Sequence, residues 1–483
     1  MTVCVDGAAS GSATMPGRRA AAWLAAACLI ATGATGWSAL AHAQPARGKT
    51  GAKAAPAYAS YTTREGDTLY DIAARYMADP TDWALLSSLN HVPAPRRMAA
   101  GIVLRLPSRR LRQDPDTARV VATSGPVEHA FDSSPYLPLK TGKTLAEGDR
   151  LRTGANGFAT LELPDGSYVT VAQNGELNIE RLRHVTLTGV ADRIFQLRAG
   201  EVESQVTHAT RRNDRFQIRS PSVVAGVRGT RFRVDYDGDT QTTAVAVLDG
   251  AVGVDPATQH GQSAAPAPGR PLPASEQLVN ASFGNVTHSG GAVGSPVQLL
   301  PAPALVRPAR VQDGKSVAFD VDPAEHAVGY RLQISHDADQ LDLVRDLRVS
   351  APHADFGDLP DGTYFVRVAS TDSNGLDGLP NVYAFERRQL GLDVSAAQRA
   401  GSRDFEFRWF VSHSNVPTRF RFLLANTAEL SHPVIDRPDL PGGELVISDL
   451  PPGIYYWTIV AEQFDNGRFY EKSSPVHSFT LAR

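Results

Sequence analysis

The sequence predicts a multidomain protein that is mainly β. The chain has 483 residues, which exceeds the roughly 250 to 300 residues at which a single hydrophobic core stops growing. After Pro107, short runs alternate apolar and polar residues with Gly or Asp-Gly at their ends, whereas helical periodicity is confined to the region before it. Two segments of the C-terminal third also repeat one another. We therefore expect a small βααβ module, an all-β domain built as a sandwich or solenoid, and two β-sandwich domains.

The N-terminal region has the features of a secretory signal peptide. Arg18-Arg19 precede a small, apolar run at 20–40, and Ala41-His42-Ala43 then supplies the small-x-small pattern that signal peptidase reads. We predict a signal peptide at 1–43, followed by a linker at 44–59. An uncleaved anchor is the alternative, because the apolar run is long enough to span a bilayer of about 30 Å.

Composition excludes several classes of function for the mature chain. Both cysteines, Cys4 and Cys28, lie in the segment that cleavage would remove, so no thiol nucleophile, thiolate metal site or disulfide is expected. The formal net charge is −3 without a long basic run, so neither nucleic acid nor an anionic membrane surface is an expected partner. No second apolar stretch follows, so we expect a protein secreted across the inner membrane to the periplasm or cell envelope. The start codon, Met1 or Met15, stays open.

The region 60–108 predicts one βααβ module. A short β-prone run at 61–63 ends in turn residues, and a helix capped by Asp67 or Thr68 carries an apolar stripe at i, i+3, i+4 and i+7. A second helix is expected at 81–89, with Trp83 on its inner side. The closing strand alternates from Gly101 to Pro107 and can pair with the first strand.

These residues resemble the LysM family of peptidoglycan and chitin binders. The resemblance rests on Tyr61, Gly66-Asp67-Thr68-Leu69, Ile72-Ala73, Tyr76, Trp83, Leu86, Asn90 and Gly101-Ile102-x-Leu104-x-Leu106-Pro107. The chain has Ala99-Ala100 where the family usually carries a Pro before the Gly.

The resemblance implies a groove for N-acetylglucosamine units between the loop after the first strand and the loop before the second. Its lining residues would be Gly66, Asp67, Thr68, Leu69, Gly101 and Ile102. Backbone amides beside glycine and a short polar side chain can bond the acetamide group, while Leu69 and Ile102 offer apolar contact to a sugar face. Another interpretation makes Asp67 only a helix cap. The expected partner is peptidoglycan or a related glycan, with no cofactor and no metal.

The segment 118–256 predicts a series of short strands. In one example, strands at 160–163 and 168–171 flank the tight turn Pro164-Asp165-Gly166-Ser167. The layout resembles the FecR domain family, which implies an all-β body with glycines at its corners. The motifs are Gly148-Asp149-Arg150-Leu151-x-Thr153-Gly154, Leu161-x-Leu163-x-Asp165-Gly166-Ser167, Leu197-x-x-Gly200-Glu201-Val202, Gly226-Val227-Arg228-Gly229-Thr230-x-Phe232-x-Val234 and Val247-Leu248-Asp249-Gly250-x-Val252.

Arg228, Arg231 and Arg233 allow two interpretations. They could form a patch that binds an anion or a partner, or they could simply face water. Period two favours the second for Arg231 and Arg233, because Phe232 and Val234 then face the core.

Glu201 and Glu203 are a candidate pair of carboxylates for glycan cleavage. Two residues apart on a strand, they would lie roughly 6.6 Å apart by backbone rise, within the range of about 6.5 to 9.5 Å used by inverting glycosidases. Two Glu flanking Val202 are also typical of an exposed strand face, and we favour that interpretation.

The remaining sequence divides into a spacer and a repeat. Residues 257–305, rich in Ala, Pro and Gly, predict a linker or a trailing hairpin of the preceding domain. Domains at 306–390 and 391–483 then share two motifs, and the Leu-Pro-x-Gly-x-Tyr corner resembles fibronectin type III. The matching segments are Tyr330-Arg331-Leu332-Gln333-Ile334 with Phe420-Arg421-Phe422-Leu423-Leu424, and Asp358-Leu359-Pro360-Asp361-Gly362-Thr363-Tyr364 with Asp449-Leu450-Pro451-Pro452-Gly453-Ile454-Tyr455.

The function predicted from these features is that of a non-enzymatic envelope protein. The LysM-like module would bind the cell wall, and the β domains would serve as a scaffold or as a surface for another envelope protein. The first alternative is a signalling regulator of the FecR type, although fewer than twenty residues precede the apolar run, too few for a cytoplasmic anti-sigma segment. The second is a peptidoglycan hydrolase. The sequence leaves open the partner of the β domains, the oligomeric state and the competence of the groove.

Overall fold

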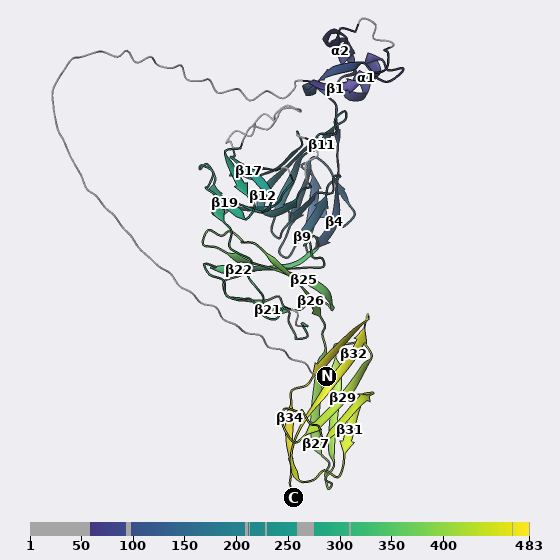
Figure 1. Cartoon of the computed structure of the whole chain (residues 1–483), viewed down its shortest axis with the longest axis vertical. Helices are drawn as coiled ribbons and strands as arrows, with labels where there is room; N and C mark the ends of the chain where they lie inside the picture. The colour runs from purple at the N-terminus through teal and green to yellow at the C-terminus, as the bar shows by residue number, and fades with distance from the viewer. Residues whose placement is uncertain are drawn as a thin grey trace, which may run out of the picture. The chain divides into compact units, whose positions relative to one another are not determined.

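A computed structural model of the chain (Figure 1) describes residues 58–482 except 93–97, 208–210, 212, 228, 258–274, 309–310 and 466. The predicted signal peptide, both cysteines, nearly all of the first linker and Arg228 therefore lie outside the described residues. In the part of the chain that is described, no helix combines the length and apolarity needed to cross a membrane.

The first domain is the expected βααβ module. Strands β1 (Tyr58–Thr62) and β2 (Val103–Pro107) pair antiparallel, with Thr62 opposite Val103. Between them lie α1 (Leu69–Tyr76), a 3₁₀ turn η1 (Pro80–Asp82) and α2 (Trp83–Asn90). Their shared core consists mainly of Tyr61, Leu69, Ile72, Ala73, Met77, Leu86, Leu104 and Leu106.

The start of the second helix differs from the prediction. Asp79 accepts a hydrogen bond from the Thr81 N–H, and this cap begins a 3₁₀ turn rather than an α-helix at Thr81. Because a 3₁₀ turn has about three residues instead of 3.6, the helix that follows begins in a different phase. Trp83 is 37% exposed and only Leu86 of α2 is buried, so the inward placement of Trp83 was wrong.

The second domain is an all-β body of two sheets that close on one another around a single core. Its strands are β3 (Gln113–Pro115), β4 (Ala118–Ser124), β5 (Val127–Phe131), β6 (Leu137–Pro138), β7 (Thr144–Leu145), β8 (Asp149–Thr153), β9 (Phe158–Glu162), β10 (Tyr168–Val171), β11 (Glu176–Val185), β12 (Ala191–Gln205), β13 (Arg215–Arg219), β14 (Val223–Val227), β15 (Arg231–Asp237), β16 (Thr242–Asp249), β17 (Ala251–Pro256), β18 (Gln277–Asn280), β19 (Phe283–His288) and β20 (Val297–Gln298).

The region predicted as a linker or trailing hairpin contributes strands to this body. β18 pairs with β17, and β19 pairs with β16 along its whole length. Residues 277–288 thus add strands to the second domain, but β18 and β19 pair with β17 and β16 in different sheets and do not form a hairpin with each other. The preceding 258–274 lie outside the described residues.

Strand β12 belongs to both sheets of the second domain. Its first part pairs with β11 up to Ala199, and its last part, from Gly200, pairs with β15 and β10. Gly200 stands at the change with φ +71°, a conformation that other residues rarely adopt. A Cβ there would approach the Cα of Gly175 to 2.8 Å. Only glycine therefore fits the point where the strand passes from one sheet to the other.

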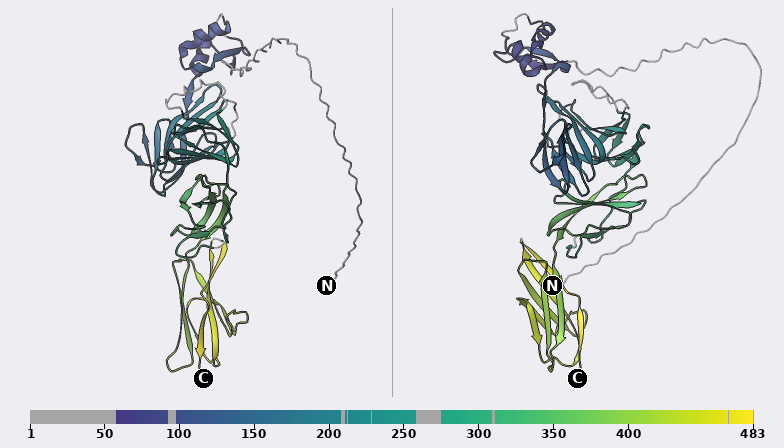
Figure 2. Two further views of the ribbon diagram at one scale, coloured as in Figure 1. Left: turned by 90° about the vertical axis from the view of Figure 1, so that its left-hand side faces the viewer. Right: turned by 180° about the vertical axis from the view of Figure 1, so that it is seen from behind.

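Two β-sandwich domains follow (Figures 1 and 2). The first pairs β21 with β24 and orders its other sheet β23-β22-β25-β26, while the second has sheets β27-β28-β31 and β30-β29-β32-β33, with β34 on β32. The bounds are β21 (Ala318–Asp320), β22 (Gly329–Ser335), β23 (Leu343–Val349), β24 (His353–Asp355), β25 (Gly362–Thr371), β26 (Asn381–Arg387), β27 (Gly391–Gln398), β28 (Phe405–Ser412), β29 (Thr418–Ala425), β30 (Ile435–Leu440), β31 (Gly443–Ile447), β32 (Gly453–Asp465), β33 (Arg468–Ser473) and β34 (His477–Leu481).

The repeated corner has the same geometry in both sandwich domains. The Tyr364 hydroxyl donates to the carbonyl of Pro360 at 3.0 Å, and the Tyr455 hydroxyl donates to that of Pro451 at 2.8 Å. A tyrosine that bonds the backbone a few residues upstream is a feature of immunoglobulin-like sandwiches. The sequence repeat thus corresponds to a repeated structural device.

Replacing Gly200 with Ala should destabilise the second domain. The left-handed backbone alone costs about 1–3 kcal/mol for a residue with a side chain, and the contact with Gly175 adds to it. Thermal unfolding should show a lower Tm for Gly200→Ala, whereas Gly238→Ala, where no atom lies within 4 Å of the added Cβ, should stay close to the parent. Equal Tm values for the two variants would contradict this account of the strand.

Candidate glycan-binding site

Two loops of the first domain lie side by side and hold all but one of the predicted lining residues. Thr63 connects them: its N–H donates to the carbonyl of Ile102, its carbonyl accepts from Gly101, and its hydroxyl donates to Ala99 at 2.7 Å. The Ile102 N–H donates to the same hydroxyl at 2.9 Å. We call residues 63–68 and 98–102 the loop pair. Sequence analysis missed Thr63, whose only signal was its place at the end of the first β-prone run.

Asp67 holds the first loop in shape. Its buried carboxylate accepts hydrogen bonds from the Tyr61 hydroxyl at 2.7 Å, the Arg64 N–H at 2.8 Å and Arg75 at 2.5 Å. Burial acts to raise the pKa of Asp67, but these hydrogen bonds outweigh it and lower the pKa below its usual value. The cap of α1 is instead Thr68, whose hydroxyl accepts from the Asp71 N–H. Asp67 is therefore engaged on three sides within the fold.

Leu69 lies at the start of α1 and is fully buried in the core. Its side chain belongs to the same apolar stripe as Ile72 and Ala73, and a helix turns that whole stripe inward. The expected apolar contact between Leu69 and a sugar face is therefore wrong for its side chain.

The exposed residues of the loop pair include Gly66, Gly101 and Ile102, together with Arg64, Glu65, Ala99 and Ala100. Both glycines have left-handed backbones, at φ +84° and +90°, and no atom lies within 4 Å of where a Cβ would stand. Ile102 is 40% exposed. Tyr70, the residue after Leu69, is 59% exposed and was missed because it lies outside the buried stripe. The loop pair thus exposes backbone at two glycines and one apolar side chain, and Tyr70 adds an exposed aromatic ring at the start of α1.

Glu201 and Glu203 lie elsewhere, on β12, and both are buried rather than exposed. Arg331 contacts Glu201 at 2.5 Å, and Arg367 contacts Glu203 at 2.8 Å. Burial acts to raise the pKa of Glu203, but Arg367 and Arg231 hold it well below its usual range. A glycosidase acid needs a raised pKa, so the geometry opposes a catalytic pair here.

Arg233 was expected to face water, and this was wrong. Its side chain is 5% exposed and donates to the carbonyl of Gly378 at 3.0 Å. Arg231 is partly exposed and donates to Glu203 at 2.9 Å. Period two did turn Phe232 and Val234 into the core, but the opposite face of the strand is covered as well.

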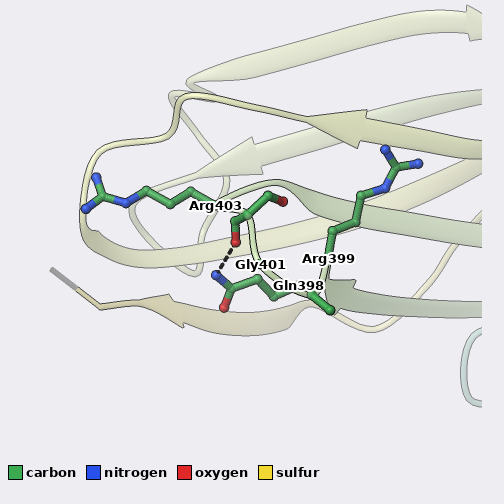
Figure 3. Close-up of a pocket in the computed structure, with 6 residues that line it drawn as sticks. Gln398, Arg399, Gly401 and Arg403 are labelled. Carbon is green, nitrogen blue, oxygen red and sulfur yellow. Dashed lines mark hydrogen bonds between the residues drawn. The ribbon is translucent and has the colours of Figure 1, made fainter.

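Two surface hollows lack the features of an active site. The first, of about 520 Å³, is formed by residues 398–403 of one hairpin loop, where the Gln398 side chain donates to the carbonyl of Ser402 and Arg399 and Arg403 point apart (Figure 3). The second, of about 330 Å³, is lined by charges that pair with each other, such as Arg388 with Asp465 at 2.8 Å. Within the described residues, no group of three His, Cys, Asp or Glu side chains could hold a metal ion.

Substitution should distinguish the buried Leu69 from the exposed Tyr70 at the start of α1. Leu69→Ala removes a fully buried side chain and should cost the first domain about 2–5 kcal/mol. Tyr70→Ala should change its stability by less than about 0.5 kcal/mol. Chemical unfolding checks both values, and a similar loss in the two variants would show that Leu69 is not packed as described.

Acid should loosen the first loop through Asp67. Because the pKa of this carboxyl is lowered on folding, its contribution is complete above the unfolded value, near 3.9, and is lost as the pH falls through the folded value. Hydrogen exchange at residues 63–68 should therefore rise below about pH 4. In Asp67→Asn, exchange at these residues should be faster at neutral pH and should depend less on acid. An unchanged acid response in the variant would assign the effect to another group.

Comparisons with known proteins match two parts of the chain. Residues 61–107 match the family model of the LysM domain, and residues 149–253 match that of the FecR protein. The search of curated proteins found no match.

Among solved structures, the chain is similar to a putative anti-sigma factor from Parabacteroides distasonis at 18% identity, covering 31% of this chain and 59% of that one, with a TM-score of 0.23. Fibronectin(III)-like modules of Clostridium thermocellum CbhA match at 13% identity over 38% of this chain and 94% of theirs, with a TM-score of 0.21. Chicken CNTN1 FN1-FN3 domains match at 15% identity over 54% and 95%, with a TM-score of 0.19. The chain thus spans less than two thirds of the anti-sigma factor, and scores this low identify no function.

LysM and FecR are both envelope-associated, non-catalytic families. Each family match falls on the segment where the motifs predicted it. The chain therefore carries a LysM domain and a FecR domain, followed by two β-sandwich domains.

Proposed function

We propose that this protein is a non-enzymatic component of the cell envelope that binds peptidoglycan, or a related N-acetylglucosamine glycan, through the loop pair of its LysM domain. The observation that carries the proposal is that Thr63 joins the two loops of a LysM-family domain, each of which exposes predicted lining residues: Gly66 in the first loop, and Gly101 and Ile102 in the second. The FecR and sandwich domains act as a scaffold or as a surface for another envelope protein. The protein is secreted across the inner membrane to act there.

The exposed residues suit a sugar chain. Gly66 and Gly101 leave the backbone uncovered, so an acetamide group can approach it at these two positions without meeting a side chain. Ile102 and Tyr70 provide apolar area for the face of a sugar ring. Asp67 and Thr63 contribute indirectly, because they hold the two loops in place. A single shallow surface gives modest affinity, so retention on the wall depends on several contacts or on several copies.

Sedimentation with purified sacculi tests the proposal. Ile102→Ala removes exposed apolar area within the loop pair, and Val103→Ala, at a neighbouring residue that is 62% exposed, is the matched control on the strand. The secreted chain and Val103→Ala should pellet with sacculi, and Ile102→Ala should bind about 3- to 10-fold more weakly, since roughly 1 kcal/mol of contact is lost. Soluble N-acetylglucosamine oligomers should compete.

The outcomes separate the proposal from its alternatives. If the parent chain stays in the supernatant, the LysM domain is structural here and the glycan proposal fails. If Val103→Ala weakens binding as much as Ile102→Ala, the sugar lies on the sheet rather than on the loop pair. Release of muropeptides from the sacculi would instead indicate a hydrolase.

The FecR match supports a second candidate, a regulator of envelope signalling. This function predicts that the chain binds an envelope partner whether or not glycan is present. Crosslinking in cells, with parent and Ile102→Ala chains compared, distinguishes the two: a regulator would keep its crosslinked partner in the variant. A wall-bound scaffold would lose its partner together with the wall.

A further inference from the structure

The outer face of one FecR sheet carries an unusual group of buried charges. Glu201 and Glu203 on β12 lie beside Arg231, Arg233 and Asp235 on β15, in the register Glu201–Asp235 and Glu203–Arg233. Burial of an unpaired charge is costly. Glu201, Glu203 and Arg233 are buried and therefore need partners on the surface that covers them, whereas Arg231 and Asp235 are partly exposed.

The first sandwich domain supplies those partners from β22, β23, β25 and the turn before β26. Arg331 contacts Glu201 at 2.5 Å, Arg348 contacts Glu201 at 3.3 Å and Arg367 contacts Glu203 at 2.8 Å. The ion pairs form two groups, five acids and five arginines in all: Glu203 with Arg231 and Arg367, and Glu201, Asp235, Asp346 and Asp377 with Arg233, Arg331 and Arg348. Gln333 connects the two groups, because it accepts from Arg367 and donates to Asp346. We call these ten residues the charge network.

The sandwich domain positions its arginines before they meet the FecR face. Asp346 holds Arg331 by two hydrogen bonds, at 3.0 and 2.6 Å. Gln333 accepts from Arg367 at 2.8 Å. A guanidinium held in this way loses little freedom when it forms a further ion pair. The contact is therefore a preorganised surface that meets a complementary one.

Strand β22 is buried on both of its faces. All seven residues of Gly329–Ser335 are buried. A strand of a two-layer sandwich normally alternates, since one face is solvated. Here Tyr330, Leu332 and Ile334 pack in the sandwich core, while the face that carries Arg331 and Gln333 is covered by the FecR domain.

The second sandwich domain provides an internal control. Arg421 occupies the position in the repeat that matches Arg331, but its side chain is 44% exposed and pairs with the partly exposed Asp436. The Arg331 side chain is 3% exposed. The repeat thus has the same strand pattern twice, and only the first copy has a docking face.

We propose that this face of the FecR domain is an intramolecular receptor for the first sandwich domain, and that the charge network selects this pairing. The two domains then form one cooperative body. The face that contains the Gly200-Glu201-Val202 motif is closed, so an envelope partner contacts the protein elsewhere.

Hydrogen exchange on the full chain tests the proposal through an effect that crosses from one domain to the other. Arg331→Met in the sandwich domain leaves Glu201 buried with a weaker partner, and it should raise exchange in FecR residues 200–205 and 231–236 by about tenfold or more. Arg421→Met is the matched control and should raise exchange only around β29 and β30. If Arg331→Met leaves the FecR strands unchanged, the proposal is overturned.

A second pair of variants covers the case in which Arg331→Met unfolds the sandwich domain. Glu203→Gln lies in the FecR domain and should raise exchange in β25 of the sandwich domain. Adding Arg367→Met to it should restore much of the protection, because both charges of the buried pair are then gone. Exchange that rises only in the FecR domain, or rises additively in the double variant, would contradict charge-selected docking.

Discussion

The passage of β12 from one sheet to the other at Gly200 is the constraint on which much of this structure depends. The strand first closes the sheet that contains β11 and β13, and then enters the sheet that contains β15 and β10. A residue with a Cβ at Gly200 would meet the backbone of Gly175, so the two sheets could not approach each other there.

The two faces of the sheet that contains β12 and β15 are buried in different ways. Val202, Phe232 and Val234 point inward and are stabilised by removal from water. This stabilisation does not require a particular direction of contact. Glu201 and Arg233 point outward and are tolerated only because the sandwich domain supplies opposite charges at the right places. Buried ion pairs add little net stability against apolar packing, but a mismatched surface would leave charges unpaired. The network is therefore better understood as selecting one partner than as adding stability.

In the LysM domain, one set of residues holds the loops in place and another set is exposed. Asp67 and Thr63 form their hydrogen bonds within the domain. Gly66, Gly101 and Ile102 are exposed on its surface. A buried carboxylate held by three donors restricts the conformations of the first loop. Preorganisation of this kind reduces the entropy lost on binding. The residues that hold the loops and the residues that face outward are thus different ones.

The sequence by itself determined the β-rich, multidomain class, the LysM and FecR segments and the repeated tyrosine corner, because alternation, turn residues and motif spacing are local properties. It also placed five of the six candidate residues in the two loops that the structure brings together. The same periodicity put Leu69 in the apolar stripe of α1, although the family resemblance had assigned it to the groove. Only the tertiary structure decided that Trp83 is partly exposed, since this depends on the phase set by the 3₁₀ turn before α2. The tertiary structure likewise decided that Glu201, Glu203 and Arg233 are buried rather than exposed to water. Period two assigns a residue to one side of a strand, but whether water or another domain covers that side depends on contacts more than a hundred residues away in the chain.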